Sequence, residues 1–387
     1  MYDVAVIGAG PSGSMAARLL GERGHSVVLL EEHVQPGAPV NCSGVIGVEA
    51  FSRYNLPSDQ IIRNIDVFRF YSPGGATLQY SHPEPLAYAV NRARFDTAMA
   101  ARAIAAGTTL MTGSRVTGIQ VDRGGVRLEV GHRPGVVRSR FVVIATGAGP
   151  KLTAQVGLGA PRNFVFGAQA ECETTSLHEV EIHLGRHVAP SNFAWVIPLQ
   201  NGRAKIGLIS DQDAGRKLRE FLDSPALDGR LISRSAAIQC SPLPLDTIPR
   251  SYADRTLVIG EAAGQIKTIT CGGIYYGFLA AEIAADVLHQ AMVSGRYRAA
   301  ALAPYEKRWR ALLQKELRIG LRLRSAFERF SDSRIEALFD LARRDGLMAL
   351  IREKANFDWH SDLVSTVFRH SLVNALFEPA AYSRLLF

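Results

Sequence analysis

The first 31 residues carry the pattern that most constrains the fold. An apolar stretch (residues 4–7) leads into three glycines with GxGxxG spacing, Gly8, Gly10 and Gly13. A helical segment follows, and a second apolar stretch ends at Glu31. In such a strand–turn–helix–strand unit the glycines permit a tight turn, the approach of a pyrophosphate and close helix packing. We therefore expect a dinucleotide site whose phosphates lie at the helix N-terminus.

Glu31 supports the same interpretation from the other end of the unit. It stands eighteen residues after Gly13, where a carboxylate accepts hydrogen bonds from the hydroxyls of the adenosine ribose. A glycine-rich turn without a ligand would not need the flanking strands, the helix and the acid together. The unit alone leaves NAD and FAD both open.

Composition excludes several protein classes. With 387 residues and 47% apolar residues, the chain is long enough for two or three packed regions. No run of eighteen apolar residues and no secretory signal is present, and four scattered cysteines do not form a disulfide framework. A cytoplasmic enzyme is expected, without metal ligands. The net charge of +8 suits an anionic surface or substrate, whereas no nucleic-acid reading motif accompanies the basic residues.

Two later stretches resemble the N-terminal unit, because in each an apolar strand is followed by a turn of small residues. A buried strand ends in the small residues Ala145, Thr146 and Gly147, where a cofactor or another backbone must come close. A second one, residues 256–260, leads through GEAAG to CGGIYYG and a new helix, whose N-terminal dipole points at that turn. Between them, residues 163–210 alternate like an inserted antiparallel sheet with one face free for a substrate.

The segment from Pro304 to Phe330 predicts an amphipathic basic helix. It holds eight Lys or Arg and three Glu, with apolar residues three or four apart. Two interpretations stay open: a solvated face over ordinary core packing, or arginines that rest on anionic lipid headgroups. The rest of the chain, from Ser333 on, predicts two or three helices without a chemical motif.

Taken together, these fingerprints resemble the flavoproteins of the para-hydroxybenzoate hydroxylase fold, and within them the geranylgeranyl reductase family. The carriers are NCSG around Cys42, YAVNRARFD (88–96), PSNFAWVIP (190–198) and the run from GEAAG to CGGIYYG (260–277). The resemblance implies an α/β chain with a Rossmann-type FAD-binding domain, an inserted antiparallel β-sheet substrate domain and C-terminal helices.

The resemblance also implies which residues contact FAD, from the ADP end to the flavin ring. These are Gly8, Gly10, Pro11, Ser12, Gly13, Glu31, Cys42, Ser43, Gly44, Arg92, Ala145, Thr146, Gly147, Gly260, Glu261, Gly264, Gly272, Gly273 and Ile274. It places Phe193, Trp195, Pro198 and Cys271 at the substrate cavity. The implied domain boundaries are 1–60, 85–160 and 250–300 for FAD, 61–84 and 161–249 for the substrate sheet, and 301–387 for the helices.

The chain departs from the family pattern at four positions. Glu261 stands where the family usually has Asp, so its contact to a ribityl hydroxyl shifts by one methylene. Phe193 replaces a common Tyr, Cys271 replaces a Gly, and Thr268 often corresponds to a Pro. Spacing does not show whether Cys271 faces the flavin or Cys42.

An isolated alkene is not electrophilic, so its reduction needs a hydride and a proton donor arranged around it. The candidate proton sources are Cys42, Tyr275, Tyr276 or a bound water, with Cys42 first because of its loop. A packing role is the alternative for each side chain. Trp195 and Phe193 share one strand face, which is either core or cavity wall.

The leading hypothesis is an FAD-dependent reductase that saturates the prenyl chain of a lipid or isoprenoid, with peripheral association at the cytoplasmic membrane face. The external reductant is left open among NADPH, NADH and reduced ferredoxin, the last of which would make an electron-donor protein a partner. A flavin monooxygenase or halogenase on the same fold is the alternative, since WVIP (195–198) resembles a halogenase motif. A third class is a flavin-bound scaffold without turnover.

Overall fold

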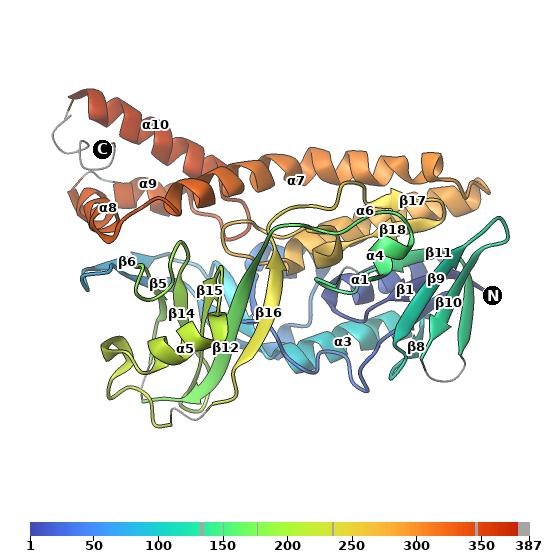
Figure 1. Cartoon of the computed structure of the whole chain (residues 1–387), viewed down its shortest axis with the longest axis horizontal. Helices are drawn as coiled ribbons and strands as arrows, with labels where there is room; N and C mark the ends of the chain where they lie inside the picture. The colour runs from blue at the N-terminus through green and yellow to red at the C-terminus, as the bar shows by residue number, and fades with distance from the viewer. Residues whose placement is uncertain (132–134, 150, 176, 234–235, 345–346, 378–387) are drawn as a thin grey trace.

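The computed structural model describes residues 1–131, 135–149, 151–175, 177–233, 236–344 and 347–377 (Figure 1). Residues 378–387 of the expected C-terminal region lie outside the described residues. The chain forms two large sheets, a small three-stranded sheet, and a layer of helices along one side.

The first large sheet contains the N-terminal strand at its centre. In spatial order its main strands are β17 (Tyr252–Ala253), β18 (Thr256–Val258), β11 (Val136–Ile144), β1 (Tyr2–Ile7), β2 (Val27–Leu30) and β8 (Thr109–Met111). The strands from β18 to β8 run parallel, while β9 (Val116–Val121) and β10 (Val126–Val130) extend β11 as an antiparallel ribbon.

Both faces of this sheet are buried, which explains its continuous apolar strands. Val4 and Val6 of β1 pack in a core with the helices α1 (Pro11–Gly21), α3 (Arg92–Ala105) and α6 (Ile274–Val293). Ala5 and Ile7 point the other way, into a core shared with the β9–β10 ribbon and residues next to it. Parallel strands with helices on one face bring their carboxyl ends, and the turns after them, to one edge.

The second large sheet has seven strands and is mostly antiparallel. Its order is β16 (Gln239–Pro244), β12 (Phe164–Glu173), β15 (Arg203–Ser210), β14 (Ala194–Pro198), β13 (Val180–His183), β5 (Val67–Tyr71) and β6 (Thr77–Ser81). The helix α5 (Ala214–Leu222) and the 3-10 turn η2 (Pro225–Leu227) bury the side chains of one face, among them Ala194, Ile206 and Leu208. On the opposite face, Val180 and Ile197 pack with Ala87 and Ala89 of a small third sheet, while Gln169 and Ile209 line a pocket.

A three-stranded sheet and a short helix connect these parts. In spatial order, the strands of this sheet are β3 (Val45–Gly47), β7 (Ala87–Val90) and β4 (Ile61–Ile65). The short helix α2 (Val48–Tyr54) follows β3, and the 3-10 turn η1 (Ser58–Gln60) precedes β4. Within the expected segment 61–84, β4 therefore belongs to this small sheet, whereas β5 and β6 join the seven-stranded sheet.

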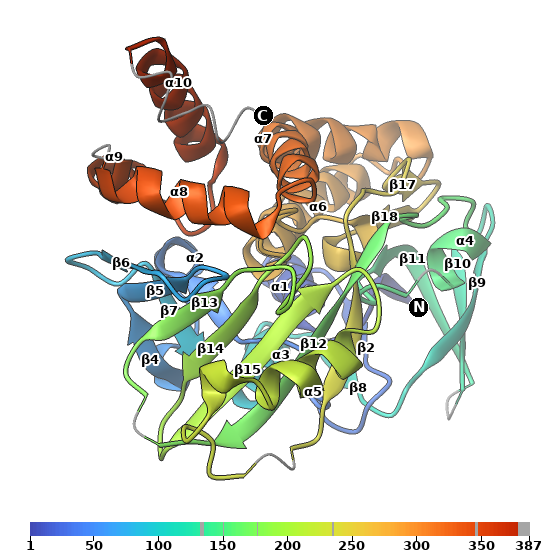
Figure 2. The same cartoon turned by 60° about the vertical axis from the view of Figure 1, so that its left-hand side comes forward.

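The helices α7 (Ala299–Phe327), α8 (Asp332–Arg344), α9 (Leu347–Lys354) and α10 (Ser361–Phe377) form the C-terminal part. α7 lies along α6 and buries Tyr305, Trp309 and Leu313 against it (Figure 1). Figure 2 shows α8 beside the seven-stranded sheet, where α8 and α9 contact β6. In the described part of the chain no helix is long and apolar enough to cross a membrane.

Candidate functional site

Three glycine-rich turns meet at the carboxyl edge of the parallel sheet. A Cβ at Gly8 would lie 2.5 Å from the carbonyl oxygen of Ala145, and one at Gly13 would lie 1.9 Å from the Gly8 carbonyl oxygen. A Cβ at Gly260 would lie 2.7 Å from Ser12 Oγ. Only glycine permits these approaches, so the sequence motifs at 8–13, 145–147 and 260–264 build one site.

The N-terminus of α1 is prepared for an anion. Gly10 caps the helix without a side-chain hydrogen bond and Pro11 is its first residue, so the first-turn N–H groups, such as that of Ser12, lack helical partners. A Cβ at Gly10 would meet no atom within 4 Å, which leaves space in front of this backbone. A pyrophosphate fits here by both charge and room.

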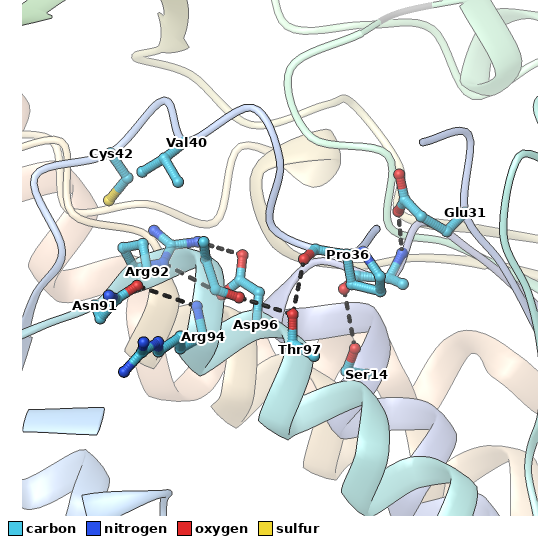
Figure 3. Close-up of polar contacts among 12 residues, drawn as sticks. Ser14, Glu31, Pro36, Val40, Cys42, Asn91, Arg92, Arg94, Asp96 and Thr97 are labelled. Carbon is cyan, nitrogen blue, oxygen red and sulfur yellow. Dashed lines mark hydrogen bonds and ion pairs between the residues drawn. The ribbon is translucent and has the colours of Figure 1, made fainter. Parts of the chain in front are cut away.

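Glu31 follows β2 at the neighbouring strand end. Its Oε2 accepts a hydrogen bond from the Ala9 N–H at 2.8 Å (Figure 3). Its Oε1 accepts one from the His33 N–H at 3.0 Å and lies 2.8 Å from His33 Nδ1. A carboxylate has about four acceptor positions. Glu31 is thus held in place by the backbone and can still accept from ribose hydroxyls.

The loop around Cys42 is held by two buried cations. Lys205 Nζ donates to the carbonyl oxygens of Cys42 at 3.1 Å and Ser43 at 3.3 Å, and burial lowers the pKa of this ammonium. Arg92, the first residue of α3, forms a bidentate ion pair with Asp96 beneath the loop (Figure 3). Its Nη2 donates to Asp96 Oδ2 at 2.8 Å and its Nε to Asp96 Oδ1 at 3.2 Å. Gly44 has φ of +79°, and a Cβ there would lie 2.8 Å from the Val90 carbonyl.

Glu261 lies between the turn after β11 and Arg92. A Cβ at Gly147 would lie 3.4 Å from Glu261 Oε2. Burial raises the pKa of the Glu261 carboxyl to about 7, and the charge of Arg92 opposes that rise. The carboxyl therefore titrates near neutrality, unusually high for a glutamate.

A pocket of about 760 Å³, including the space at its open mouth, joins the Cys42 loop, the free face of the seven-stranded sheet and the turn before α6. Its lining comprises Asn41, Cys42, Ser43, Val45, Ile46, Gly47, Gly167, Ala168, Gln169, Trp195, Ile209, Gln239, Ser241, Leu243, Lys267, Thr270, Cys271, Gly272, Gly273, Ile274, Tyr275 and Asp358. The lining combines aliphatic and aromatic side chains with polar and charged ones, so it can hold a ligand that has both apolar and polar parts.

Cys271 adopts a left-handed conformation, with φ of +55°, where the family resemblance implies glycine. Arg324 of α7 fixes this turn: its Nε donates to the Thr268 carbonyl at 2.9 Å and one Nη lies 3.5 Å from Cys271 Sγ. The other Nη donates to Asn192 Oδ1 at the start of the substrate-sheet motif. Burial raises the pKa of the Cys271 thiol to about 11, so this thiol keeps its proton at neutral pH.

The C-terminal segment closes the same pocket. Lys267 Nζ pairs with Asp358 Oδ1 at 2.9 Å, and both side chains are buried. Tyr275 donates its hydroxyl hydrogen bond to Glu49, while Tyr276 donates to the Asp358 carbonyl at 3.0 Å. Burial raises the pKa of both phenols.

The structure does not bring every predicted residue to the pocket. Tyr276 is buried against the C-terminal segment and lies outside the lining. Phe193 stands beside Trp195, with ring centroids 6.0 Å apart, and Pro198 ends β14, but neither lines the pocket. Gly264, at φ of +72°, packs on the loop at Asp246 and so supports the turn from behind.

Several site residues were missed by the sequence motifs. Lys205 belongs to no motif, although a lysine inside the buried strand RAKIGLIS is a visible signal. Lys267 is buried within GQIKTIT, the segment that links the GEAAG and CGGIYYG motifs. Arg324, Asp358 and Gln169 lie in segments without a motif, and only the fold brings them together.

Comparisons with known proteins agree with this site. The family model described as pyridine nucleotide-disulphide oxidoreductase matches residues 2–188. A digeranylgeranylglycerophospholipid reductase of Methanococcus aeolicus is 30% identical over 353 residues, which cover 88% of this chain and 90% of that protein. The chain belongs to the geranylgeranyl reductase family of FAD-dependent oxidoreductases.

Solved structures share the fold of this geranylgeranyl reductase family member. A geranylgeranyl bacteriochlorophyll reductase-like protein of Thermoplasma acidophilum superposes with a TM-score of 0.83 at 21% identity, covering 99% of this chain and 98% of the other. A flavin-dependent brominase gives a TM-score of 0.73 at 17% identity, with coverage of 97% and 99%. The expected α/β fold is confirmed, and with the family so are FAD as cofactor and an oxidoreductase acting on carbon–carbon bonds.

The described residues fit FAD. The N-terminus of α1, the open space at Gly10 and the carboxylate of Glu31 suit its ADP half. Thr146 Oγ1 is buried without a hydrogen-bond partner among the described residues, in the turn where a cofactor would come close. An unpaired buried hydroxyl is uncommon and indicates a missing ligand group.

The pKa of Glu261 makes the stability of the FAD-free protein depend on pH. The folded state prefers the protonated carboxyl, so the cost of charging it appears as pH rises from about 4.5 through 7 and is complete above 7. Glu261→Gln should therefore raise the free energy of unfolding by roughly 3 kcal/mol at pH 8 and leave it unchanged near pH 4.5. Chemical denaturation across this range measures the difference, with the exposed Glu84→Gln as control; a pH-independent difference would contradict the assignment.

Proposed function

We propose that this enzyme saturates carbon–carbon double bonds of a prenyl chain, of the geranylgeranyl type, carried by a lipid or isoprenoid. The pocket carries the proposal, because a largely apolar wall formed by residues such as Val45, Ile209 and Leu243 adjoins a cysteine loop. The relatives' name, digeranylgeranylglycerophospholipid reductase, supports a prenylated lipid as substrate.

The chain's own residues would position the alkene and hold the proton. When bound, reduced FAD would supply a hydride equivalent and would itself become oxidised. Cys42 Sγ is our first candidate for the proton that the other alkene carbon receives, because its loop lines the pocket and Lys205 fixes the loop backbone. A proton donor that lines the pocket, or a water bound there, would lie within reach of the alkene.

The two tyrosines are less suited to deliver that proton. Tyr275 lines the pocket, but its hydroxyl hydrogen is donated to Glu49. Tyr276 lies outside the lining and donates to the Asp358 carbonyl. Both remain candidates of second rank, together with a bound water.

Anaerobic turnover tests the proposed reaction. The holoenzyme, reduced with dithionite, should be reoxidised by a geranylgeranyl lipid in the absence of oxygen, and mass spectrometry should show a product two hydrogens heavier per reduced bond. Reoxidation only with oxygen, with release of hydrogen peroxide or with a hydroxylated or halogenated product, would favour the monooxygenase or halogenase. Tight FAD binding without any substrate-dependent reoxidation would favour a scaffold.

Replacement of the Cys42 thiol tests its role as proton source. Cys42→Ser should retain FAD and slow single-turnover reoxidation by substrate by about 100-fold or more, in the range typical of positioned general acids. Stopped-flow absorbance of the flavin measures the rate. Cys240→Ser is the matched control, because this cysteine is exposed and its side chain lies beside α5, outside the pocket lining. An unchanged rate in Cys42→Ser would transfer the role to another donor.

We also propose that the outer face of α7 docks on anionic lipid. Exposed leucines, Leu312, Leu321 and Leu323, stand among exposed cations such as Lys315 and Arg322. The helix runs along the outer edge of the molecule (Figure 1). Arg324 does not belong to the exposed basic face of α7. Its side chain is buried and donates to the Thr268 carbonyl in the turn before α6.

Charge removal on α7 tests this docking. Because each cation near an anionic bilayer contributes about 1 kcal/mol, replacing Lys315, Arg318 and Arg322 by Gln should weaken binding to phosphatidylglycerol vesicles roughly 100-fold. Binding should also fall steeply with salt. Vesicle co-sedimentation measures both effects, with Arg115, Arg138 and Arg219, all exposed elsewhere, replaced by Gln as a charge-matched control. Salt-independent binding, or equal loss in the control, would contradict docking by α7.

A further inference from the structure

Two buried polar atoms of the pocket lining have no hydrogen-bond partner among the described residues. They are Gln169 Oε1 and Trp195 Nε1. Gln169 is only 6% exposed. Native proteins pair nearly all buried polar side-chain atoms, so each exception needs an explanation.

The strand register places both side chains in one row. Gln169 of β12 is opposite Gly207 of β15, and Gly207 is opposite Trp195 of β14. Side chains of directly opposed residues project from the same face of a sheet. A Cβ at Gly207 would lie 2.6 Å from Trp195 Cε2, the ring carbon bonded to Nε1. The indole therefore leans over the glycine, into the gap that separates it from Gln169.

The two atoms offer complementary hydrogen bonds. Gln169 Nε2 donates to the Val40 carbonyl oxygen at 3.4 Å, so a flipped amide would bring two oxygens together. This contact leaves Oε1, an acceptor, for the pocket. The Trp195 indole N–H can only donate. A group that satisfies both atoms must itself donate one hydrogen bond and accept another.

We propose that Gln169 and Trp195 form a binding site for a hydroxyl group, which donates to Gln169 Oε1 and accepts from Trp195 Nε1. A hydrocarbon segment of a prenyl chain satisfies neither atom. The hydroxyl belongs either to a bound water, which would then be a proton carrier inside the apolar pocket, or to the polar end of an isoprenoid alcohol. The inference rests on the proposed function for its substrate, but its test requires no turnover.

Indole nuclear magnetic resonance tests this site directly, because the chain has three tryptophans. Trp309 donates to Ser251 Oγ and Trp359 to Glu49 Oε2, so their signals are internal references. In the FAD-loaded protein, a bound water gives a cross-relaxation peak at the Trp195 N–H that Gln169→Leu removes. If the occupant is a substrate hydroxyl, geranylgeraniol shifts the Trp195 signal and the corresponding hydrocarbon does not.

Binding measurements complete the test. With a substrate hydroxyl, Gln169→Leu and Trp195→Phe should each weaken geranylgeraniol about 3- to 10-fold and leave the hydrocarbon unchanged. If the occupant is a water, the two variants should change the affinities for the alcohol and for the hydrocarbon equally, and the water peak should be present in the unaltered protein. Gln120→Leu, at an exposed position outside the pocket lining, is the matched control and should leave the Trp195 signal in place.

Three results would overturn the proposal. Trp195 could show neither a water peak nor a response to the alcohol, while Gln169→Leu shifts its signal, which would mean that the two side chains bond each other. Its signal could respond to FAD loading alone, which would assign the pair to the cofactor. Alternatively, the alcohol and the hydrocarbon could bind every variant equally, with no water peak. Failure of turnover with a hydroxyl response intact would instead reject the proposed reaction alone.

Discussion

The buried ion pair between Lys267 and Asp358 connects the cofactor turn to the C-terminal segment. Removing both charges from water costs several kcal/mol per ion, and the pair is tolerated because its 2.9 Å contact is supplemented by a hydrogen bond from Lys267 to the Phe357 carbonyl at 3.0 Å. Loss of one partner would leave the other charge buried and unpaired. A Cβ at Gly47 would lie 1.9 Å from Asp358 Oδ2, so only glycine fits at this position of β3 while Asp358 stays in place. The enclosure of the pocket therefore depends on two residues that are 91 positions apart.

The helix α7 supports the same turn from a second side. A Cβ at Gly320 would lie 2.2 Å from Thr268 Oγ1, which donates to the Leu317 carbonyl at 3.2 Å. Arg324, one turn further along, then reaches three parts of the site, although all its partners are neutral. Its guanidinium thereby holds Cys271 in a left-handed conformation that is costly for a residue with a Cβ. The helix α7 therefore helps to build the turn before α6 and the pocket beside it.

The parts of the site predicted from sequence are those with a local physical cause. Glycines at 8, 10 and 13 are required by the turn itself, and Glu31 by the strand end, so pattern and structure agree there. The alternating segment 163–210 was expected to form an antiparallel sheet, and strands β12 to β15 lie in it. The contribution of Lys205, Arg324 and Asp358 depends on tertiary contacts between distant segments. No periodicity or spacing encodes such contacts, and the segment after Ser333 was accordingly expected to carry no chemistry.

The distribution of unpaired polar atoms links the cofactor site with the pocket. Among the described residues, five buried side-chain nitrogen or oxygen atoms lack a partner, and three of these belong to Thr146, Gln169 and Trp195. Each would cost about 1–3 kcal/mol if it stayed unpaired in the working enzyme. An apolar cavity for a prenyl chain could be built without them, since leucine or phenylalanine would pack in the same positions. Thr146 lies in the turn after β11, and Gln169 and Trp195 line the pocket, which indicates that ligands rather than side chains complete these hydrogen bonds.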